Sequence, residues 1–424
     1  MEPEPLGDLG TGRRRSLFER DAGIEEIRSQ VSDIVDQVRE EGDAALREFS
    51  RRFDDVDVGN LDITDRAERA VEDLDDDVRT AIEDAAANIR AFHARQQPTD
   101  WRTTVDGREL GRRFRPIERA GVYVPGGRAA YPSSALMGVI PAAVAGVEHI
   151  VVTTPPAEEL DPATLAALSV AGADAIYNVG GAQAVAAMAY GTESVEPVQK
   201  IVGPGNRWVT AAKEVVQEEV AIDFLAGPSE VLVVADSTAR PAFVAADLLA
   251  QAEHDPDASV VAVTPSETVA RETAEEVRSQ LAGRERREVI EEALARDASG
   301  IFWTRSMSEA VLFAEEYAPE HLSIQAADDE AVLDRIDSAG SVFLGPYTPV
   351  AAGDYATGTN HVLPTGAAAK VVGGLSVDTF MRASTVQRLE REALGDLRET
   401  VTRLARTEGL EAHAESVDVR FADE

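Results

Sequence analysis

Gln251 and His254 are the residues from which the chemistry of this chain can first be argued. They are three apart near the end of residues 242–252, where alanines and apolar side chains predict a helix. On a helix this spacing places both side chains on one face, roughly 5–6 Å apart at Cβ. A neutral imidazole beside an amide oxygen is half of a metal site, and Pro256 ends the helix where a ligand can reach the pair. A solvated polar pair favoured by the helix dipole is the commoner explanation of the same spacing.

Two later stretches also combine histidine with a carboxylate. Glu320 and His321 follow a proline, on a turn into a predicted strand. Because adjacent residues of extended backbone point in opposite directions, we expect them to serve different proton transfers, or one of them to be structural. Asp354 and His361 lie in a loop of small residues that leaves room for a substrate. Four of the six histidines lie in turns beside Gly, Pro or a carboxylate: His254, His321, His361 and His413. Spacing alone does not show that they meet.

Composition limits the kinds of partner. The formal net charge is −36, and arginine replaces lysine at nearly every basic position, with lysine only at 200, 213 and 370. Such a surface suits a salt-rich cytoplasm, where screening relieves self-repulsion, so we expect a halophilic protein. The charge argues against nucleic acid or an anionic membrane as partner. No stretch is long and apolar enough to span a bilayer, and we expect a cytoplasmic protein.

The order of elements predicts two α/β domains. Residues 1–15 are acidic and rich in Gly and Pro, and we expect them to be disordered. Amphipathic helices are predicted within residues 24–53 and 61–93, and from residue 120 short apolar strands alternate with helices. This alternation indicates parallel sheets with crossover connections. The fold class is therefore α/β, with two incomplete Rossmann-like parallel-sheet domains and small helical N- and C-terminal segments.

We divide the chain into four parts on this basis. Residues 1–20 form a disordered or arm-like N-terminus, and residues 21–120 with 231–375 form a first α/β domain carrying the metal and catalytic residues. Residues 121–230 form a second α/β domain, which carries the glycine turns. Residues 376–424 form a C-terminal helical tail, with a helix at 384–404 and a last strand at 416–421. The cleft between two such domains is the expected site.

Glycine turns follow several strands of the second domain, at the edge where parallel sheets bind ligands. Asn206 is a candidate N-cap, leaving free N–H groups for phosphate oxygens. Neither Gly-x-Gly-x-x-Gly nor Gly-x-x-x-x-Gly-Lys-Ser/Thr occurs in this stretch, which excludes a P-loop NTPase. The pattern alone leaves nucleotide binding open.

Seven motifs, in order along the chain, resemble the histidinol dehydrogenase family. They are Gly121-Val-Tyr-Val-Pro-Gly-Gly127, Gly180-Gly-Ala-Gln183, Gly203-Pro-Gly-Asn206, Ala226-Gly-Pro-Ser-Glu230, Gln251-Ala-Glu-His254, Pro319-Glu-His-Leu322 and Gly353-Asp-Tyr-Ala-Thr-Gly-Thr-Asn-His361. Each motif is weak alone, but the series is specific and covers roughly residues 20 to 415.

The resemblance implies an enzyme that oxidises L-histidinol to L-histidine through an aldehyde, with two NAD+ and one Zn²⁺ per subunit. It assigns the zinc ligands as Gln251, His254, Asp354 and His413. It assigns further substrate contacts to Ser229, His321, His361 and Glu408, together with those four ligands. It places Tyr123, Gln183 and Asn206 on the cofactor side, and makes Glu320 and His321 the acid–base pair. The family is homodimeric, and its C-terminal segment reaches the partner's site, so Glu408 and His413 are expected to act across the dimer.

The residue inventory agrees with this chemistry. Oxidation of the alcohol needs a base for the hydroxyl proton, and His321 is the expected one, poised near neutral pH. Aldehyde oxidation often uses a cysteine adduct, but the chain has no cysteine, so water must add instead. Glu320 is the expected base for that water. Two alternatives stay open: a zinc hydrolase in which Glu320 activates water, and a two-domain binding protein without catalysis.

Overall fold

A computed structural model describes residues 1–20, 23–126 and 130–422. The described chain forms two compact units, one comprising residues 1–96 and 117–380 and the other residues 97–116 and 381–424. The larger unit contains two parallel sheets and the smaller one an antiparallel sheet, with helices in both. The predicted α/β class with two parallel-sheet domains is confirmed. No helix of the described ranges is long and apolar enough to cross a membrane.

The six-stranded sheet of the larger unit has the order β1-β11-β10-β9-β12-β13, and all its pairs are parallel. Its strands are β1 (Glu4–Pro5), β9 (Glu230–Ala235), β10 (Ser259–Thr264), β11 (Gly300–Trp303), β12 (His321–Gln325) and β13 (Ser341–Leu344). Its helices are η1 (Leu6–Asp8), α1 (Thr11–Phe18), α10 (Pro241–Ala252), α11 (Glu267–Leu281), α12 (Arg287–Ala295), α13 (Met307–Tyr317), α14 (Asp329–Leu333) and α15 (Val350–Tyr355). Two short turns of helix follow, η4 (Ala368–Lys370) and η5 (Val377–Phe380).

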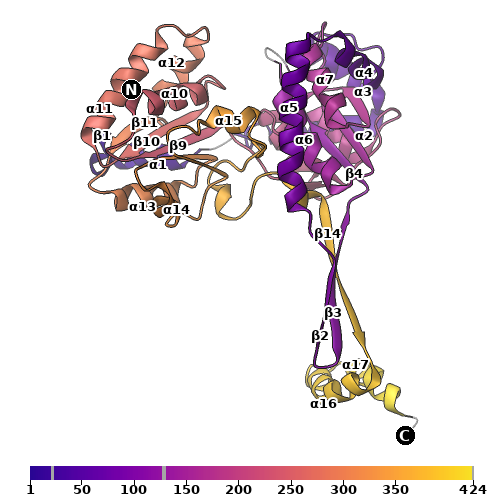
Figure 1. Cartoon of the computed structure of the whole chain (residues 1–424). Coiled ribbons are helices and arrows are strands. Elements are labelled where there is room, and N and C mark those ends of the chain that lie inside the picture. The colour runs from indigo at the N-terminus through magenta and orange to yellow at the C-terminus, as the bar shows by residue number, and fades with distance from the viewer. Residues whose placement is uncertain (21–22, 127–129, 423–424) are drawn as a thin grey trace. The chain divides into compact units, whose positions relative to one another are not determined.

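Alternate residues of these strands face two separate cores. Val231 and Val233 of β9 pack with α10, α11 and α12, whereas Leu232 and Val234 pack with α1 and α13. Figure 1 shows these helices on opposite faces of the sheet. Burial on both faces explains why β9 and β10 are almost continuously apolar.

The N-terminal residues are part of this layer, so the expectation of disorder at residues 1–15 is wrong. Strand β1 pairs with β11 at the sheet edge, and Leu6 and Leu17 are buried in the core that contains α13. The sequence did not predict this strand, because residues 1–15 contain few apolar side chains. A two-residue edge strand is specified by its pairing partner and not by its own pattern.

The five-stranded sheet has the order β6-β5-β4-β7-β8 and is also parallel throughout. Its strands are β4 (Arg119–Tyr123), β5 (His149–Thr154), β6 (Ala175–Asn178), β7 (Lys200–Val202) and β8 (Ala221–Ile222). The crossover helices are α6 (Pro132–Ala145), α7 (Pro162–Ala171), α8 (Gly181–Tyr190) and α9 (Arg207–Val216). Gly127 of the first motif lies outside the described residues.

The helices within residues 28–96 pack on this sheet, whereas the sequence grouped residues 21–120 with the other one. They are α2 (Arg28–Glu41), α3 (Asp43–Phe49), η2 (Ser50–Asp54), α4 (Thr64–Asp73), α5 (Asp76–His93) and η3 (Ala94–Gln96). Helix α2 contacts α8 and α9, α4 contacts α7, and α5 contacts α6. Val31, Val35 and Val38 of α2 belong to the core of the five-stranded sheet. Amphipathic periodicity predicted the helices but could not show which sheet their apolar faces cover.

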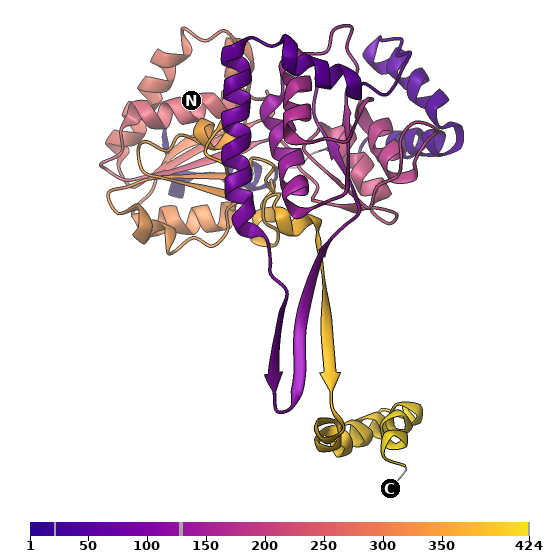
Figure 2. The same cartoon turned by 45° about the vertical axis from the view of Figure 1, so that its right-hand side comes forward.

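The smaller unit combines a three-stranded antiparallel sheet with two helices. Its elements are β2 (Trp101–Val105), β3 (Arg108–Pro116), β14 (Met381–Leu389), α16 (Arg391–Thr407), α17 (Glu411–Asp418) and η6 (Val419–Phe421). Strand β14 pairs with β3 over nine residues, and Figure 2 shows the three strands side by side. The expectations of a helix beginning at residue 384 and a strand at 416–421 are therefore wrong. These strands are mostly exposed and lack apolar alternation, so only pairing over a long sequence separation specifies them.

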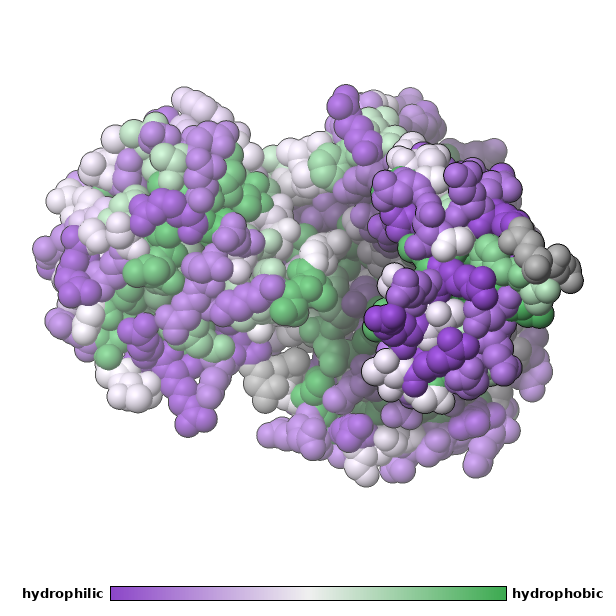
Figure 3. All heavy atoms as spheres, turned by 90° about the horizontal axis from the view of Figure 1, so that it is seen from below, coloured by the Kyte–Doolittle hydropathy of each residue, from purple (hydrophilic) through white to green (hydrophobic). Residues whose placement is uncertain are grey.

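The surface agrees with the acid-rich composition. Figure 3 shows a face that is largely hydrophilic, with smaller hydrophobic patches between. Each of the three lysines donates its ammonium to a backbone carbonyl. Lys200 bonds Thr379, Lys213 bonds Gly203 and Lys370 bonds Glu316.

Candidate active site

Glu320 and His321 come together at the start of β12. Ala318, in the left-handed region at φ 48°, ends α13, and the chain turns before the strand begins at His321. Glu320 therefore precedes the extended segment, and its Oε2 lies 3.4 Å from His321 Nδ1. The expectation that the two side chains point apart is wrong, because strand alternation does not apply to the turn. Both side chains are buried and can act on one substrate.

The charges around His321 set its protonation. Burial lowers the pKa of the ring, but the carboxylates of Glu320 and Asp354 more than offset burial, so the pKa lies well above its usual value. Nε2 lies 3.5 Å from Asp354 Oδ1, an ion-pair distance that is long for a hydrogen bond. The direction of this shift differs from the near-neutral pKa expected from the sequence.

Ser229 and Gln251 extend this cluster as a chain of hydrogen bonds. Gln251, in the last turn of α10, donates from Nε2 to Ser229 Oγ at 2.6 Å, and Ser229 donates to Glu320 Oε2 at 2.6 Å. The remaining amide oxygen, Gln251 Oε1, is buried and has no hydrogen-bond partner among the described residues. A buried acceptor without a donor is costly unless a ligand fills the role, and an oxygen of this kind can coordinate a cation.

Asp354 and His361 lie on the next side of the cluster. Asp354 is buried in the short helix α15, and its backbone carbonyl accepts a 3.0 Å hydrogen bond from His361 Nδ1. His361 Nε2 accepts a hydrogen bond from Ser134 Oγ at 3.2 Å. Burial lowers the pKa of this ring, which agrees with a neutral ring that donates from Nδ1 and accepts at Nε2. Burial raises the pKa of Asp354, but the bond and charge of His321, with smaller effects of His361 and His254, hold it below its usual range.

The residues expected to bind zinc are only partly assembled within one unit. His254 lies just past α10, is exposed and acts electrostatically on Asp354. Glu408 and His413, after and within the C-terminal helices, are exposed and belong to the smaller unit. Within residues 1–20, 23–126 and 130–422, no three His, Asp or Glu side chains form a metal-binding group. An amide oxygen such as Gln251 Oε1 is outside those residue types, and as a buried acceptor without a donor it has the chemistry of a cation ligand.

The residues expected on the cofactor side lie at the carboxyl edge of the five-stranded sheet. Tyr123 ends β4, and its hydroxyl accepts a 3.1 Å hydrogen bond from the Gly181 N–H; burial raises the pKa of this phenol to about 12. Gln183 is buried in the first turn of α8. Asn206 caps α9 by accepting from the N–H groups of Trp208 and Val209, as the sequence predicted.

A buried ion pair fixes the turn before Asn206. Lys213 Nζ lies 2.6 Å from Asp223 Oδ1 and donates to the Gly203 carbonyl at 2.7 Å, and both charged side chains are at most 3% exposed. Asp223 Oδ2 accepts from the Gly203 N–H at 2.9 Å. Gly203 has φ 111°, and a Cβ there would meet the Tyr123 carbonyl oxygen at 2.2 Å. The pair therefore holds a turn that only glycine can form.

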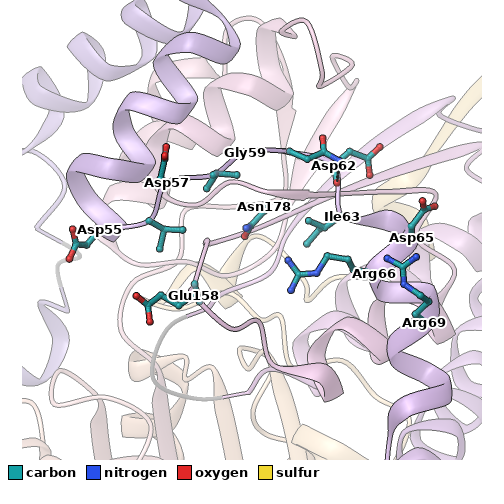
Figure 4. A pocket seen from close by; sticks show the side chains of 14 residues that line it. Asp55, Asp57, Gly59, Asp62, Ile63, Asp65, Arg66, Arg69, Glu158 and Asn178 are labelled. Atoms are coloured by element: carbon teal, nitrogen blue, oxygen red, sulfur yellow. Dashed lines mark hydrogen bonds between the residues drawn. The ribbon is translucent and has the colours of Figure 1, made fainter.

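A pocket of about 730 Å³ opens at the same edge, beside the ends of β5 and β6 (Figure 4). Asn178, the last residue of β6, is buried, and its Oδ1 has no hydrogen-bond partner in the described chain. Arg66, Arg69 and Glu158 also line the pocket. Its size suits a ligand of cofactor dimensions, and its polar rim offers both donors and acceptors.

Comparison with known proteins resolves the family. A family profile described as histidinol dehydrogenase matches residues 18–421. The chain belongs to the histidinol dehydrogenase family. Membership makes it an NAD-dependent oxidoreductase of histidine biosynthesis, and it excludes the hydrolase and the non-enzymatic binding protein that the residues alone left open.

Relatives support this membership over the whole chain. Histidinol dehydrogenase of Haloarcula marismortui is 68% identical over 99% of the chain and 100% of its own length, and that of Halobacterium salinarum is 68% identical over 100% of both. Their source agrees with the halophilic character predicted from charge. The crystal structure of histidinol dehydrogenase from Elizabethkingia anophelis superposes with a TM-score of 0.94, at 38% identity, covering 100% of this chain and 98% of that one.

Four buried residues beside the site were missed from the sequence: Arg20, Lys213, Glu230 and Asp247. Two of them carried a signal. Lys213 is one of only three lysines in an arginine-rich chain, and Glu230 closes the fourth family motif. Arg20 and Asp247 had none, since each resembles many other charged residues on predicted helices or loops.

Proposed function

We propose that this enzyme oxidises L-histidinol to L-histidine, through histidinaldehyde, with two NAD+. One water enters, and two hydrides leave as two NADH with release of protons. The hydrogen-bonded cluster of Ser229, Gln251, Glu320 and His321 supports the proposal, because it combines an acid–base pair with substrate-orienting polar groups in one buried place. This cluster is the observation on which the proposal depends.

His321 and Glu320 have separate proton roles in this proposal. His321 donates from Nδ1 to the Glu230 carbonyl at 3.0 Å, which directs Nε2 toward Asp354 and leaves it as the atom that exchanges a proton with the substrate hydroxyl. Two carboxylates raise the pKa of this ring, and engagement of Asp354 by a cation would leave only Glu320 to do so. Glu320 then takes a proton from the water that adds to the aldehyde, because no thiol is present to form an adduct.

We assign one Zn²⁺ per subunit to Gln251, His254, Asp354 and His413. Zinc supplies orientation and polarisation of the amino alcohol when it is bound. Gln251 Oε1 and Asp354 are the buried oxygen donors of this set, and His254 offers an exposed imidazole at the end of α10. Ser229, His361 and Glu408 would complete the substrate contacts.

We further propose a homodimer in which Glu408 and His413 complete the partner's site. Both residues are exposed on a unit that contains no part of the buried cluster, which is what a contribution across subunits needs. NAD+ is assigned to the carboxyl edge of the five-stranded sheet, with Tyr123, Gln183 and Asn206, and its adenosine half to the pocket of Figure 4. A cytoplasmic location stays a prediction of the sequence.

The test is histidinol-dependent NADH formation together with metal analysis. We expect two NADH per histidinol and about one zinc per chain in the parent. Glu320→Gln should form the acid more slowly by 10²–10⁴-fold, the contribution of a general base, while aldehyde reduction by NADH persists. Equal rates of acid formation in variant and parent would remove the role of Glu320, and no NADH from histidinol would remove the function.

A further inference from the structure

A buried ion pair lies directly behind the proposed acid–base pair. Arg20 Nη1 is 2.6 Å from Glu230 Oε2, and the two side chains are 2% and 1% exposed. Arg20 Nη2 donates to the Tyr317 carbonyl at 2.6 Å, and its guanidinium carbon lies 3.8 Å from the centroid of the Tyr317 ring. The N-terminal segment thus delivers a cation to the interior, more than 200 residues away from its partner in sequence.

The main chain of Glu230 contacts both proposed catalytic side chains. Its N–H donates to Glu320 Oε2 at 2.7 Å, and its carbonyl accepts from His321 Nδ1 at 3.0 Å. Glu230 is the first residue of β9, which pairs with β12 from His321 onward. The placement of this one residue therefore determines the carboxylate position of Glu320 and the tautomer of His321 together.

The side chain of Glu230 is what anchors that residue. Its Oε1 accepts from the Gly366 N–H at 2.7 Å, and its Oε2 is held by Arg20. Burial raises the pKa of the Glu230 carboxyl to about 7, against Arg20, which lowers it, and the nearby Glu320 carboxylate adds to the rise. Two buried carboxylates this close need a cation, since a buried charge without a partner is strongly unfavourable.

We propose that Arg20 is a positioning residue for the oxidation, which acts through Glu230 to hold Glu320 and His321 in their working arrangement. The inference rests on the proposed function. Arg20 touches neither catalytic side chain in the contacts of the described residues, so its effect must pass through the start of β9. Through Arg20 the N-terminal segment would support the acid–base pair, in addition to covering the edge of the sheet.

The variant Arg20→Met tests this role, because it keeps the side-chain length and removes the charge. In molar KCl we expect kcat for histidinol oxidation to fall by about 10–100-fold, the effect of displacing reacting groups by about an ångström. KM for histidinol and for NAD+ should change less than about threefold, since Arg20 binds neither. Arg20→Lys should recover part of kcat, and millimolar guanidinium chloride should recover part of the activity of Arg20→Ala.

Arg13→Ala is the matched control. Arg13 comes from the same N-terminal segment and anchors it, by bonds to the Arg296 and Ser299 carbonyls and to Asp297, at 26% side-chain exposure. Its loss loosens the segment without removing the Glu230 partner, so kcat should stay within about twofold of the parent. A fall as large as that of Arg20→Met would show that the segment matters only as a structural cover.

Two further measurements separate positioning from general stability. Glu230→Gln combined with Arg20→Met should reduce kcat no more than the worse single change, because both act through one residue. Additive losses would overturn the coupling. Long-range ¹H–¹⁵N spectra of the histidine rings, with the His321 signal identified by its absence in His321→Gln, should show His321 protonated at Nδ1 in the parent and altered in Arg20→Met.

The ring spectrum does not depend on turnover, so it tests the positioning role even if histidinol proves not to be oxidised. An unchanged His321 signal in folded Arg20→Met, or a kcat within twofold of the parent, would overturn the proposal. If Arg20→Met does not fold, the Arg20→Lys protein and the ring spectrum of Glu230→Gln decide it by the same criteria. Failure of the parent to form NADH would instead overturn the proposed function alone.

Discussion

Removing the ammonium of Lys213 should destabilise the enzyme through the turn that precedes Asn206. In Lys213→Met, Asp223 stays buried at 1% side-chain exposure without its 2.6 Å partner, and the Gly203 carbonyl loses its 2.7 Å donor. Breaking one side of a buried ion pair typically costs about 3–5 kcal/mol. This is a large part of the roughly 5–15 kcal/mol by which folded proteins are stable. The same change should raise KM for NAD+ more than KM for histidinol, because we assign this turn to the proposed NAD+ site.

Urea unfolding in molar KCl measures the loss directly. The urea midpoint should fall with an unchanged slope, because the exposed area on unfolding is the same. Lys200→Met is the comparison: its ammonium is only partly buried and donates to one carbonyl, so the expected loss is about 1 kcal/mol. Combining Lys213→Met with Asp223→Asn should restore most of the loss, because no unpaired charge remains. A loss below about 1 kcal/mol for Lys213→Met, or a double variant as unstable as the single one, would refute the reasoning.

Three other changes test the site and its support. Asp247→Asn should raise the free energy of unfolding at pH 8 by up to about 3 kcal/mol, because burial raises the pKa of this carboxyl from 3.8 to about 6 and its ionisation therefore opposes folding. Urea unfolding between pH 4 and 8 should show that the gain disappears toward pH 4, where the carboxyl is protonated in both states. A gain that does not depend on pH would contradict this cause. His254→Ala should lower the affinity for zinc by at least about 10-fold and lose activity together with the metal, as metal analysis after dialysis would measure. Retention of stoichiometric zinc would remove His254 from the ligand set. Mixed dimers of His413→Ala and Glu320→Gln chains should regain up to about a quarter of the parent activity if sites are shared, as measured by the NADH assay after subunit exchange, and no recovery would argue against sharing.

The parallel sheets could be predicted because both of their faces are buried. Runs such as residues 231–235 and 260–263 are apolar at every position and are separated by amphipathic helices, so local pattern and final position agree. Asn206 followed the same logic, because an N-cap depends only on the next three residues. The sequence therefore predicted those elements whose conformation is decided by contacts between neighbouring residues.

Strands β2, β3 and β14 could not be predicted from the sequence, because the contacts that decide them are not local. Residues 381–389 carry two arginines and several small polar residues, and their burial pattern gives no alternation that a sequence could display. Their strand conformation comes from pairing with residues 108–116, which lie more than 260 positions earlier. Strand preference of this kind is set by the partner and not by the segment.

The site itself was predictable only through resemblance. Spacing placed Gln251 near His254, but nothing local showed that Ser229 and Glu320 would join Gln251 in one hydrogen-bonded chain. Strand alternation even gave the wrong relation between Glu320 and His321, because the turn after Ala318 intervenes. Arg20 is the extreme case, since its partner is 210 residues away.

The distribution of lysines makes this protein unusually simple to label. Lys213 is enclosed, and Lys200 is partly enclosed with its nitrogen engaged, so amine-reactive dyes should reach mainly the α-amino group and exposed Lys370. A reagent selective for α-amino groups would leave Lys370 for a second reagent. Two distinct fluorophores could thus be attached without engineering any cysteine into the chain.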